Sequence, residues 1–167
     1  MAEHRYHFVS QWTAAAPAEA AYAAIYEVTR YPAWWPEVKE VRRLSEEHLW
    51  LRTRSLLPYD LAFDLRRTIA DPVGGVLEAV LSGDLEGRIR WTIETAETAE
   101  SGCRITFDEN VVTNKRALNV FAPIARPAFV ANHALMMSHG KAGLRTFLSG
   151  YTLGREQAAI SGVGDLR

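Results

Sequence analysis

The chain has 167 residues, of which 48% are hydrophobic and 23% charged, and its formal net charge is -1. A chain of this length buries a sizeable core without disulfide or metal support, so we expect one globular domain. The near-zero net charge argues against a protein that binds nucleic acid or an anionic membrane through an overall positive field. The single cysteine, Cys103, excludes an internal disulfide and favours a reducing compartment, so we expect a cytoplasmic protein.

The N-terminal segment predicts one strand followed by two short helices. Residues 6–13 alternate in the period of a strand, with Phe8, Ser10 and Trp12 on one face. Pro17 opens an alanine-rich run, and proline fits the first turn of a helix because its missing N–H has no partner there. A second short helical turn follows this run.

Two prolines bracket a pair of tryptophans. Pro32 and Pro36 flank Trp34 and Trp35, and proline at that spacing stops regular helix and forces a tight bend. In so short a bend the two indoles cannot be buried in the same way. We therefore expect one to pack under the sheet and the other to border a cavity.

Six further strands are predicted between residues 38 and 113. They are Val38–Leu44, His48–Leu57, Leu61–Ile69, Val76–Leu81, Leu85–Thr95 and Cys103–Thr113. Short gaps rich in turn residues join them, which is typical of antiparallel hairpins. Because the strands are grouped rather than alternating with helices, the predicted fold class is α+β.

One long amphipathic helix is predicted from Pro127 to Tyr151. Its apolar residues recur every three or four positions, and His133 and Gly140 share the stripe with Phe129. A helix laid across a curved sheet can enclose a cavity. We place the domain at residues 1–153 and expect residues 154–167, which contain three glycines, to be a frayed helix end and a mobile tail.

Common catalytic and metal-binding motifs do not account for the chain. Ser138–Lys141 matches the S-x-x-K pattern, but Gly140 interrupts it and the partner motifs of that enzyme class are absent. His133 and His139 are six residues apart, which puts them on different sides of a helix. We therefore expect no metal site and no cofactor.

The strand faces turned toward the long helix are mostly apolar, with a few polar positions. Ser10, Arg67 and Glu109 interrupt these faces, and such a mixture is typical of a ligand cavity. Two alternatives stay open for the charged groups. They either reach solvent at strand ends, or Arg67 and Glu109 pair with each other.

His133 is the most specific single candidate, because an imidazole that points at the sheet can act as a general acid or base. The alternative is a core histidine bonded to a backbone carbonyl, to Asn132 or to a nearby hydroxyl. Met136 and Met137 beside it are flexible side chains that suit an adaptable pocket as well as a plain core.

Several stretches of the chain together carry a family resemblance. They are Phe8–Trp12, Ala16–Glu19, Tyr31–Pro36, Gly83–Gly87 with Arg90-Trp91, and Asn132-His133 ahead of Gly140 and Gly143-Leu144. These stretches resemble the START-like superfamily, also called SRPBCC, and within it bacterial polyketide cyclase/dehydrase and lipid-transport proteins. The resemblance covers about residues 6 to 150. It implies a helix-grip fold, in which a curved seven-stranded antiparallel sheet wraps around the C-terminal helix and two short helices follow the first strand.

The resemblance implies no shared catalytic set. Cyclases of this type resemble templates whose pocket supplies an arginine, tyrosine or similar polar group. On this chain the candidates for such a role are Tyr59, Arg67, Glu109 and His133.

Three functions are therefore compared. We expect first a carrier or sensor that binds a hydrophobic, lipid- or polyketide-like molecule between sheet and helix. The alternative is a polyketide cyclase or dehydratase, with His133 or Glu109 as base and Arg67 or Tyr59 polarising a carbonyl. A third is a protein–protein module with an exposed tryptophan. The expected ligand contacts are Ser10, Trp12, Phe63, Trp91, Phe107, Phe129, His133, Met136 and Met137. We expect no nucleic-acid partner and no integral membrane association, and the pattern does not indicate an oligomeric state.

Overall fold

The computed structural model describes residues 5–97, 102–114 and 122–162. Its strands are β1 (Arg5–Ala14), β2 (Val38–Arg43), β3 (His48–Thr53), β4 (Leu61–Asp71), β5 (Val76–Gly83), β6 (Leu85–Thr95) and β7 (Cys103–Thr113). Its helices are α1 (Ala18–Tyr26), the short 3-10 helix η1 (Val28–Ala33) and α3 (Ala122–Gly162).

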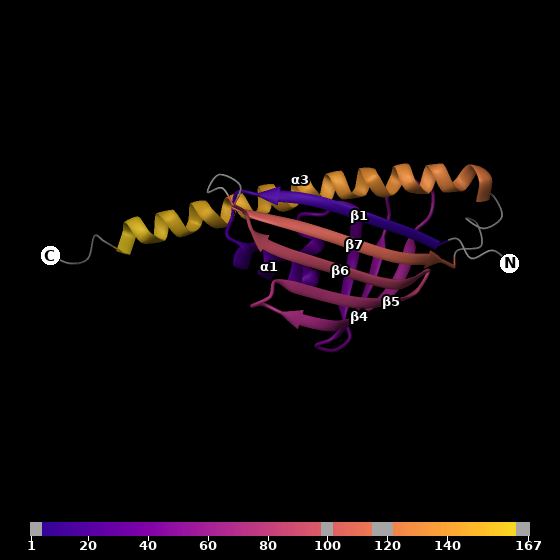
Figure 1. Ribbon diagram of the computed structural model, residues 1–167, viewed down its shortest axis with the longest axis horizontal. Helices are drawn as coiled ribbons and strands as arrows, with labels where there is room; N and C mark the ends of the chain where they lie inside the picture. Colours follow the sequence, from indigo (N-terminus) through magenta and orange to yellow (C-terminus); the bar gives the residue numbers. More distant parts are fainter. Residues whose placement is uncertain (1–4, 98–101, 115–121, 163–167) are drawn as a thin grey trace.

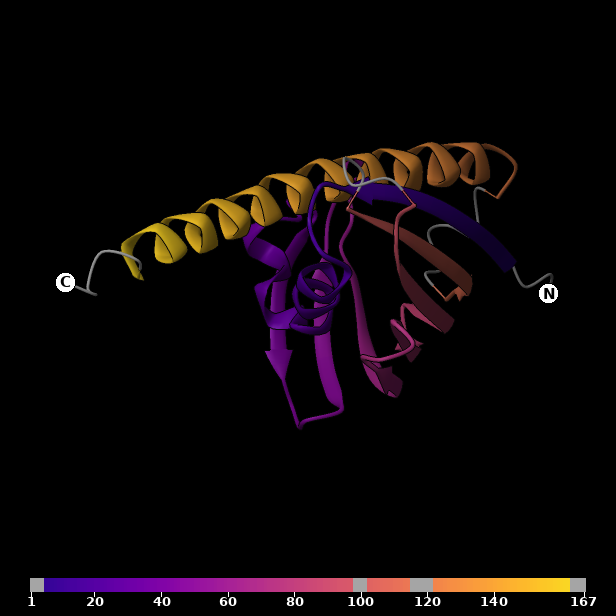
Figure 2. The same cartoon turned by 60° about the vertical axis from the view of Figure 1, so that its left-hand side comes forward.

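All seven strands belong to one antiparallel sheet with the order β1-β7-β6-β5-β4-β3-β2. The first strand pairs with the last one in the sequence, and every other neighbour is a hairpin partner. The sheet curves strongly, and α3 runs across its open side with α1 nearby (Figures 1 and 2). This arrangement confirms the predicted α+β helix-grip fold.

Several strand ends differ from the prediction, and β4 contains a bulge. β3 ends at Thr53 rather than at Leu57, because a loop that contains Pro58 occupies the intervening residues. On β4 the register shifts between Arg67 and Ile69, so that two residues face one on β5. This bulge breaks the alternation. Ile69, which would share the inner face with Phe63 and Leu65 if the alternation continued, is consequently exposed.

Helix α3 is longer at both ends than predicted. It begins at Ala122 and includes Pro127, at the cost of one helical hydrogen bond. It continues to Gly162, past the domain limit placed at residue 153, and its C-terminal part extends beyond the sheet (Figure 1). The end of the expected tail, residues 163–167, lies outside the described residues. Within the described part of the chain, no helix combines the length and the apolar character needed to cross a bilayer.

The inner face of the sheet forms the core. Along β7 every second residue from Cys103 to Thr113 is buried, and the residues between them are not. The same alternation on β1 buries Trp12 and leaves its neighbours exposed. These alternating faces agree with the predicted strand register, because a slip of one residue would turn the apolar set to solvent.

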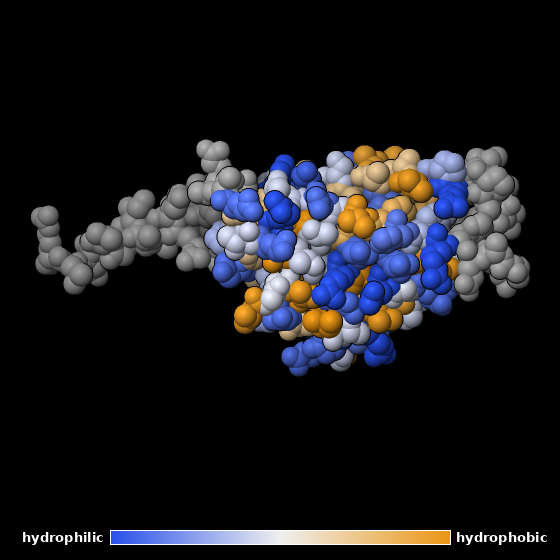
Figure 3. Space-filling model, viewed as in Figure 1, coloured by the Kyte–Doolittle hydropathy of each residue, from blue (hydrophilic) through white to orange (hydrophobic). Residues whose placement is uncertain are grey.

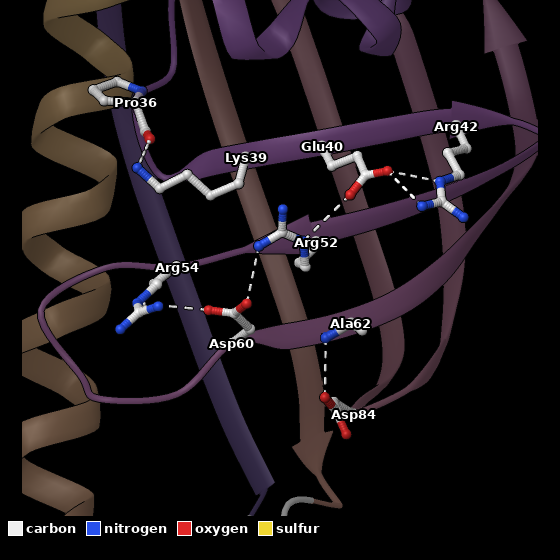
Figure 4. Close-up of polar contacts among 9 residues, drawn as sticks. All are labelled: Pro36, Lys39, Glu40, Arg42, Arg52, Arg54, Asp60, Ala62 and Asp84. Carbon is white, nitrogen blue, oxygen red and sulfur yellow. Dashed lines mark hydrogen bonds and ion pairs between the residues drawn. The ribbon is translucent and has the colours of Figure 1, made fainter.

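The outer face carries the scattered arginines. Arg52 donates to Glu40 and to Asp60, and Arg42 and Arg54 extend the same chain of ion pairs (Figure 4). Figure 3 shows one face on which hydrophilic residues are mixed with small apolar patches. Exposed pairs of this kind contribute little to the free energy of unfolding.

Helix α3 approaches the Trp34-Trp35 bend very closely, and two glycines permit this. A Cβ at Gly140 would lie 2.7 Å from the Trp35 indole and 3.1 Å from the Trp12 indole. A Cβ at Gly143 would lie 1.6 Å from the Trp34 carbonyl oxygen. The Trp35 Nε1–H donates to the Met136 carbonyl at 3.0 Å, which fixes the helix at this point. Both indoles are buried, contrary to the expectation that their burial differs. Trp35 lines the cavity described below and Trp34 does not, so one of the two borders the cavity as expected.

Because of this contact, replacing glycine by alanine should change the free energy of unfolding in opposite directions at two positions of α3. Gly143→Ala should lower the free energy of unfolding by about 1–3 kcal/mol, because the new methyl meets backbone that cannot move aside. Gly150→Ala is the matched control, since a Cβ there meets nothing within 4 Å. It should raise stability by up to about 1 kcal/mol through helix propensity. Urea unfolding measures both, and equal stability of the two variants would contradict the close approach.

Candidate functional site

A cavity lies between the inner face of the sheet and α3. Its volume is about 130 Å³, counted as the space open to the centre of a water molecule. A single water needs only about 10–15 Å³ on this measure, so the space is that of a small organic ligand. Aromatic rings form much of the wall, namely Tyr26, Tyr31, Trp35, Phe63, Trp91, Phe107 and Phe129. The wall is thus apolar and rich in flat surfaces.

One polar pair interrupts this wall. His133 Nε2 and Glu109 Oε2 are 2.7 Å apart, and both side chains are nearly buried, at 13% and 10% exposure. β7 turns Glu109 inward, whereas its neighbour Asp108 faces outward and contacts His7. The pairing satisfies a buried carboxylate that would otherwise be costly.

The imidazole of His133 is also held by ring stacking. Phe8 on β1 lies 3.8 Å from it, measured between ring centroids, with an interplanar angle of 11°. On α3, His133 is one helical turn from Phe129 and from Met137, which are both buried. Helix geometry, the Phe8 ring and the Glu109 carboxylate therefore fix the ring from three directions.

The hydrogen-bond partner of His133 differs from those expected for a core histidine. Its partner is Glu109, not Asn132 or a backbone carbonyl. Asn132 instead accepts a hydrogen bond from the Leu56 N–H and donates to the Met136 sulfur. The pair can hold a proton, orient a polar ligand group, or transfer a proton to and from a ligand.

Arg67 lines the cavity but does not pair with Glu109, contrary to one of the two alternatives. Its guanidinium lies 3.9 Å from the centre of the Tyr26 ring and donates to the Tyr26 carbonyl at 3.0 Å. Glu47 lies 3.6 Å away in the turn before β3. The charge of Arg67 is thus engaged at the end of the cavity beside α1, away from α3.

The structure brings most of the predicted site residues together. Phe63, Trp91, Phe107, Phe129, His133, Met136, Met137, Arg67 and Glu109 all line the cavity. Ser10, Trp12 and Tyr59 do not belong to its lining. Trp12 instead packs behind the wall, 5.3 Å from Trp91 and 5.8 Å from Trp35 between ring centroids.

Some cavity residues were not predicted as ligand contacts. Tyr31, Leu61 and Asn132 line the cavity, and Phe8 supports it from behind His133. The bracketing prolines drew attention to Trp35 but not to Tyr31, whose hydroxyl donates to the Ile25 carbonyl at 2.7 Å. Only the curvature of the sheet brings this bend to the cavity, and sequence spacing does not report it.

Metal binding finds no support in the geometry of the described residues. Among the side chains that the structure describes, in residues 5–97, 102–114 and 126–150, no three histidine, cysteine or acidic groups lie so that they could hold a metal ion. Cys103 is buried, and burial raises the pKa of its thiol.

The fold and the cavity define a helix-grip protein with a hydrophobic pocket between the sheet and α3. The sequence model of the family described as "Polyketide cyclase / dehydrase and lipid transport" matches residues 14–130, and the chain belongs to this family. A comparison with curated protein sequences finds no match.

Solved structures show the same fold at low sequence identity. The chain is similar to the Zhui aromatase/cyclase of a Streptomyces species, with 16% identity, a TM-score of 0.71, and coverage of 87% of this chain and 94% of that one. A START superfamily protein from Mycobacterium smegmatis gives 16% identity, a TM-score of 0.67, and coverage of 89% of this chain and 99% of that one. The di-domain ARO/CYC protein BexL gives 16% identity, a TM-score of 0.66, and coverage of 86% of this chain and 50% of that one.

The raised pKa of the Tyr59 hydroxyl predicts that the free energy of unfolding falls at alkaline pH. Burial raises the pKa of its hydroxyl from 10.0 to about 12, and the Tyr6 phenol adds to the rise. The folded state therefore keeps a proton that the unfolded state loses, so this contribution is complete below pH 10 and disappears as the pH rises to about 12.

Tyr59→Phe should make the fall in unfolding free energy between pH 10 and 12 shallower than in the wild type. Urea unfolding at a series of pH values measures the slope, and phenolate absorbance counts the groups that titrate. Some slope should remain, because burial also raises the pKa of Tyr31. An identical slope in both proteins would show that Tyr59 ionises equally in the folded and unfolded states.

Proposed function

We propose that this protein binds one hydrophobic small molecule of lipid- or polyketide-like character in the cavity, as a carrier or a sensor. The observation that supports this most directly is the apolar, aromatic wall that the sheet and α3 build around open space. Such pockets are the usual form of small-molecule sites.

The energetics favour an apolar ligand. Each Å² of apolar surface removed from water contributes about 25 cal/mol before the costs of ordering the ligand are subtracted. Met136 and Met137 lie at the α3 side of the cavity, and their flexible thioether chains can adjust to ligands of different shape. The proposed site therefore selects by size and apolar character, with His133 and Glu109 as the orienting polar groups.

A cyclase or dehydratase is the second candidate, and the His133–Glu109 pair favours it. In this reaction His133 would take a proton from the carbon beside a ligand carbonyl, while Glu109 holds the imidazole in place. The aromatase/cyclase neighbours share the fold at 16% identity, which supports the fold and leaves the activity as a proposal.

A protein–protein module that docks through an exposed tryptophan is not favoured. All five tryptophans lie in the described residues. Trp12, Trp34, Trp35 and Trp91 are buried, and Trp50 is half-buried under the guanidinium of Arg42, 4.9 Å from its ring centre.

Filling the cavity should abolish binding without unfolding the protein. Ala79 on β5 is 5% exposed and lines the cavity, so Ala79→Phe places a ring into open space. We expect the affinity for the neutral dye Nile red to fall by about tenfold or more, since the ring occupies apolar area that the dye would bury. Fluorescence titration measures the affinity, and circular dichroism checks the fold.

Ala70→Phe is the matched control, because Ala70 is exposed near the end of β4. It should bind the dye as the wild type does. If Ala79→Phe also bound the dye normally, the dye would not occupy this cavity. Gentle purification followed by mass spectrometry then identifies any natural ligand that accompanies the wild type.

His133→Gln separates catalysis from binding. Glutamine can still donate a hydrogen bond to Glu109, but it cannot take up a proton at neutral pH. If the protein is a cyclase, turnover of a synthetic poly-β-ketone should fall by about 10²-fold or more while binding changes little.

His139→Gln is the control, since His139 contacts Glu37 at 2.5 Å and neither residue lines the cavity. Chromatography of the cyclised products measures turnover. Equal turnover by wild type and His133→Gln would remove His133 from the chemistry, and no turnover by any of the three proteins would favour the carrier or sensor.

A further inference from the structure

The charge of the polar wall restricts which ligands the cavity can accept. Glu109 is 7% exposed and lines the cavity, and His133 is its hydrogen-bond partner. With a neutral imidazole the pair carries a charge of −1, and with a protonated imidazole it carries none. In neither state does the pair present a net positive charge to a ligand.

The other charged groups of the lining do not reverse this balance. Arg67 is engaged by the Tyr26 carbonyl, the Tyr26 ring and Glu47 at the α1 end. Glu78 is a second acid, and its carboxylate contacts Arg90 at 3.0 Å and Arg88 at 3.8 Å. A ligand carboxylate near α3 would therefore meet another carboxylate in a site with little water, and this costs free energy.

Glu109 also retains capacity to accept hydrogen bonds. A carboxylate has two oxygens and about four acceptor positions, and the contact with His133 uses one oxygen. A hydroxyl group on the ligand can donate to this carboxylate, and such charge-assisted bonds are stronger than neutral ones. An ether or an unsubstituted ring could not make this bond.

Resting on the proposed function, we infer that the cavity selects uncharged aromatic ligands bearing a hydroxyl or phenol that donates to Glu109, and that it rejects carboxylates such as free fatty acids. The aromatic part follows from the flat walls, where Trp91 and Phe107 lie 4.2 Å apart between ring centroids. Glu109 is in this sense the residue that determines specificity.

Three ligands of nearly equal shape test this inference on the wild-type protein. At neutral pH 2-naphthol is an uncharged donor, naphthalene is uncharged without a donor, and 2-naphthoate is an anion. We expect 2-naphthol to bind about tenfold more tightly than naphthalene, because its hydroxyl bonds a charged acceptor. We expect 2-naphthoate to bind most weakly. Isothermal titration calorimetry and quenching of tryptophan fluorescence measure the three affinities.

Glu109→Gln removes the charge and keeps the shape. In this variant 2-naphthol should lose most of its advantage over naphthalene, and 2-naphthoate should gain affinity because the amide can donate to it. Glu37→Gln is the matched control, since Glu37 is also buried and paired with a histidine of α3 but does not line the cavity. It should preserve the wild-type order.

The outcomes separate the inference from the proposed function. Wild-type binding of 2-naphthoate as tight as that of 2-naphthol would overturn the charge selection while leaving a ligand-binding cavity in place. An unchanged order in Glu109→Gln would show that another group selects the ligand. Failure of all three compounds and of Nile red to bind would overturn the proposed function itself. The wild-type order stands as a test even if Glu109→Gln does not fold.

Discussion

The close packing of α3 against the Trp34-Trp35 bend is the contact on which the rest of the structure depends. Gly140 and Gly143 remove the side chains that would hold the helix away, and the Trp35 indole bonds the helix backbone at Met136. This contact holds α3 against the bend. On the N-terminal side of the contact, the helix residues Phe129 and His133 line the cavity.

The two faces of the sheet differ in polarity, with ion pairs on the outer face and mostly apolar side chains on the inner face that lines the site. Ion pairs such as Arg52 with Asp60 remain on the outer face, where they cost little and contribute little. On the inner face of β7 Glu109 lies between the apolar residues Phe107 and Val111, and His133 supplies the partner that a buried carboxylate requires. A polar pair inside an apolar wall is expensive to maintain, which is why such pairs often mark functional sites.

The relatives agree on the fold and differ in what their descriptions say they do. The neighbours include a START superfamily protein and aromatase/cyclases, each with 16% identity to this chain. At that distance the backbone is shared, whereas the side chains that line a pocket need not be. The function of this chain must therefore be argued from its own cavity residues, above all Glu109 and His133.

The sequence alone determined the order of the strands along the chain, the residues that face inward on each strand and the apolar stripe of α3. These features depend on local periods of two and 3.6 residues. Hence Phe107, Glu109 and His133 were all expected to face the interior. Only the tertiary structure decided that Glu109 pairs with His133 rather than with Arg67, that a bulge turns Ile69 outward, and that Tyr31 reaches the cavity while Tyr59 does not. These outcomes depend on the curvature of the sheet and on the position of α3 relative to the sheet. Both arise from contacts between residues far apart in the chain.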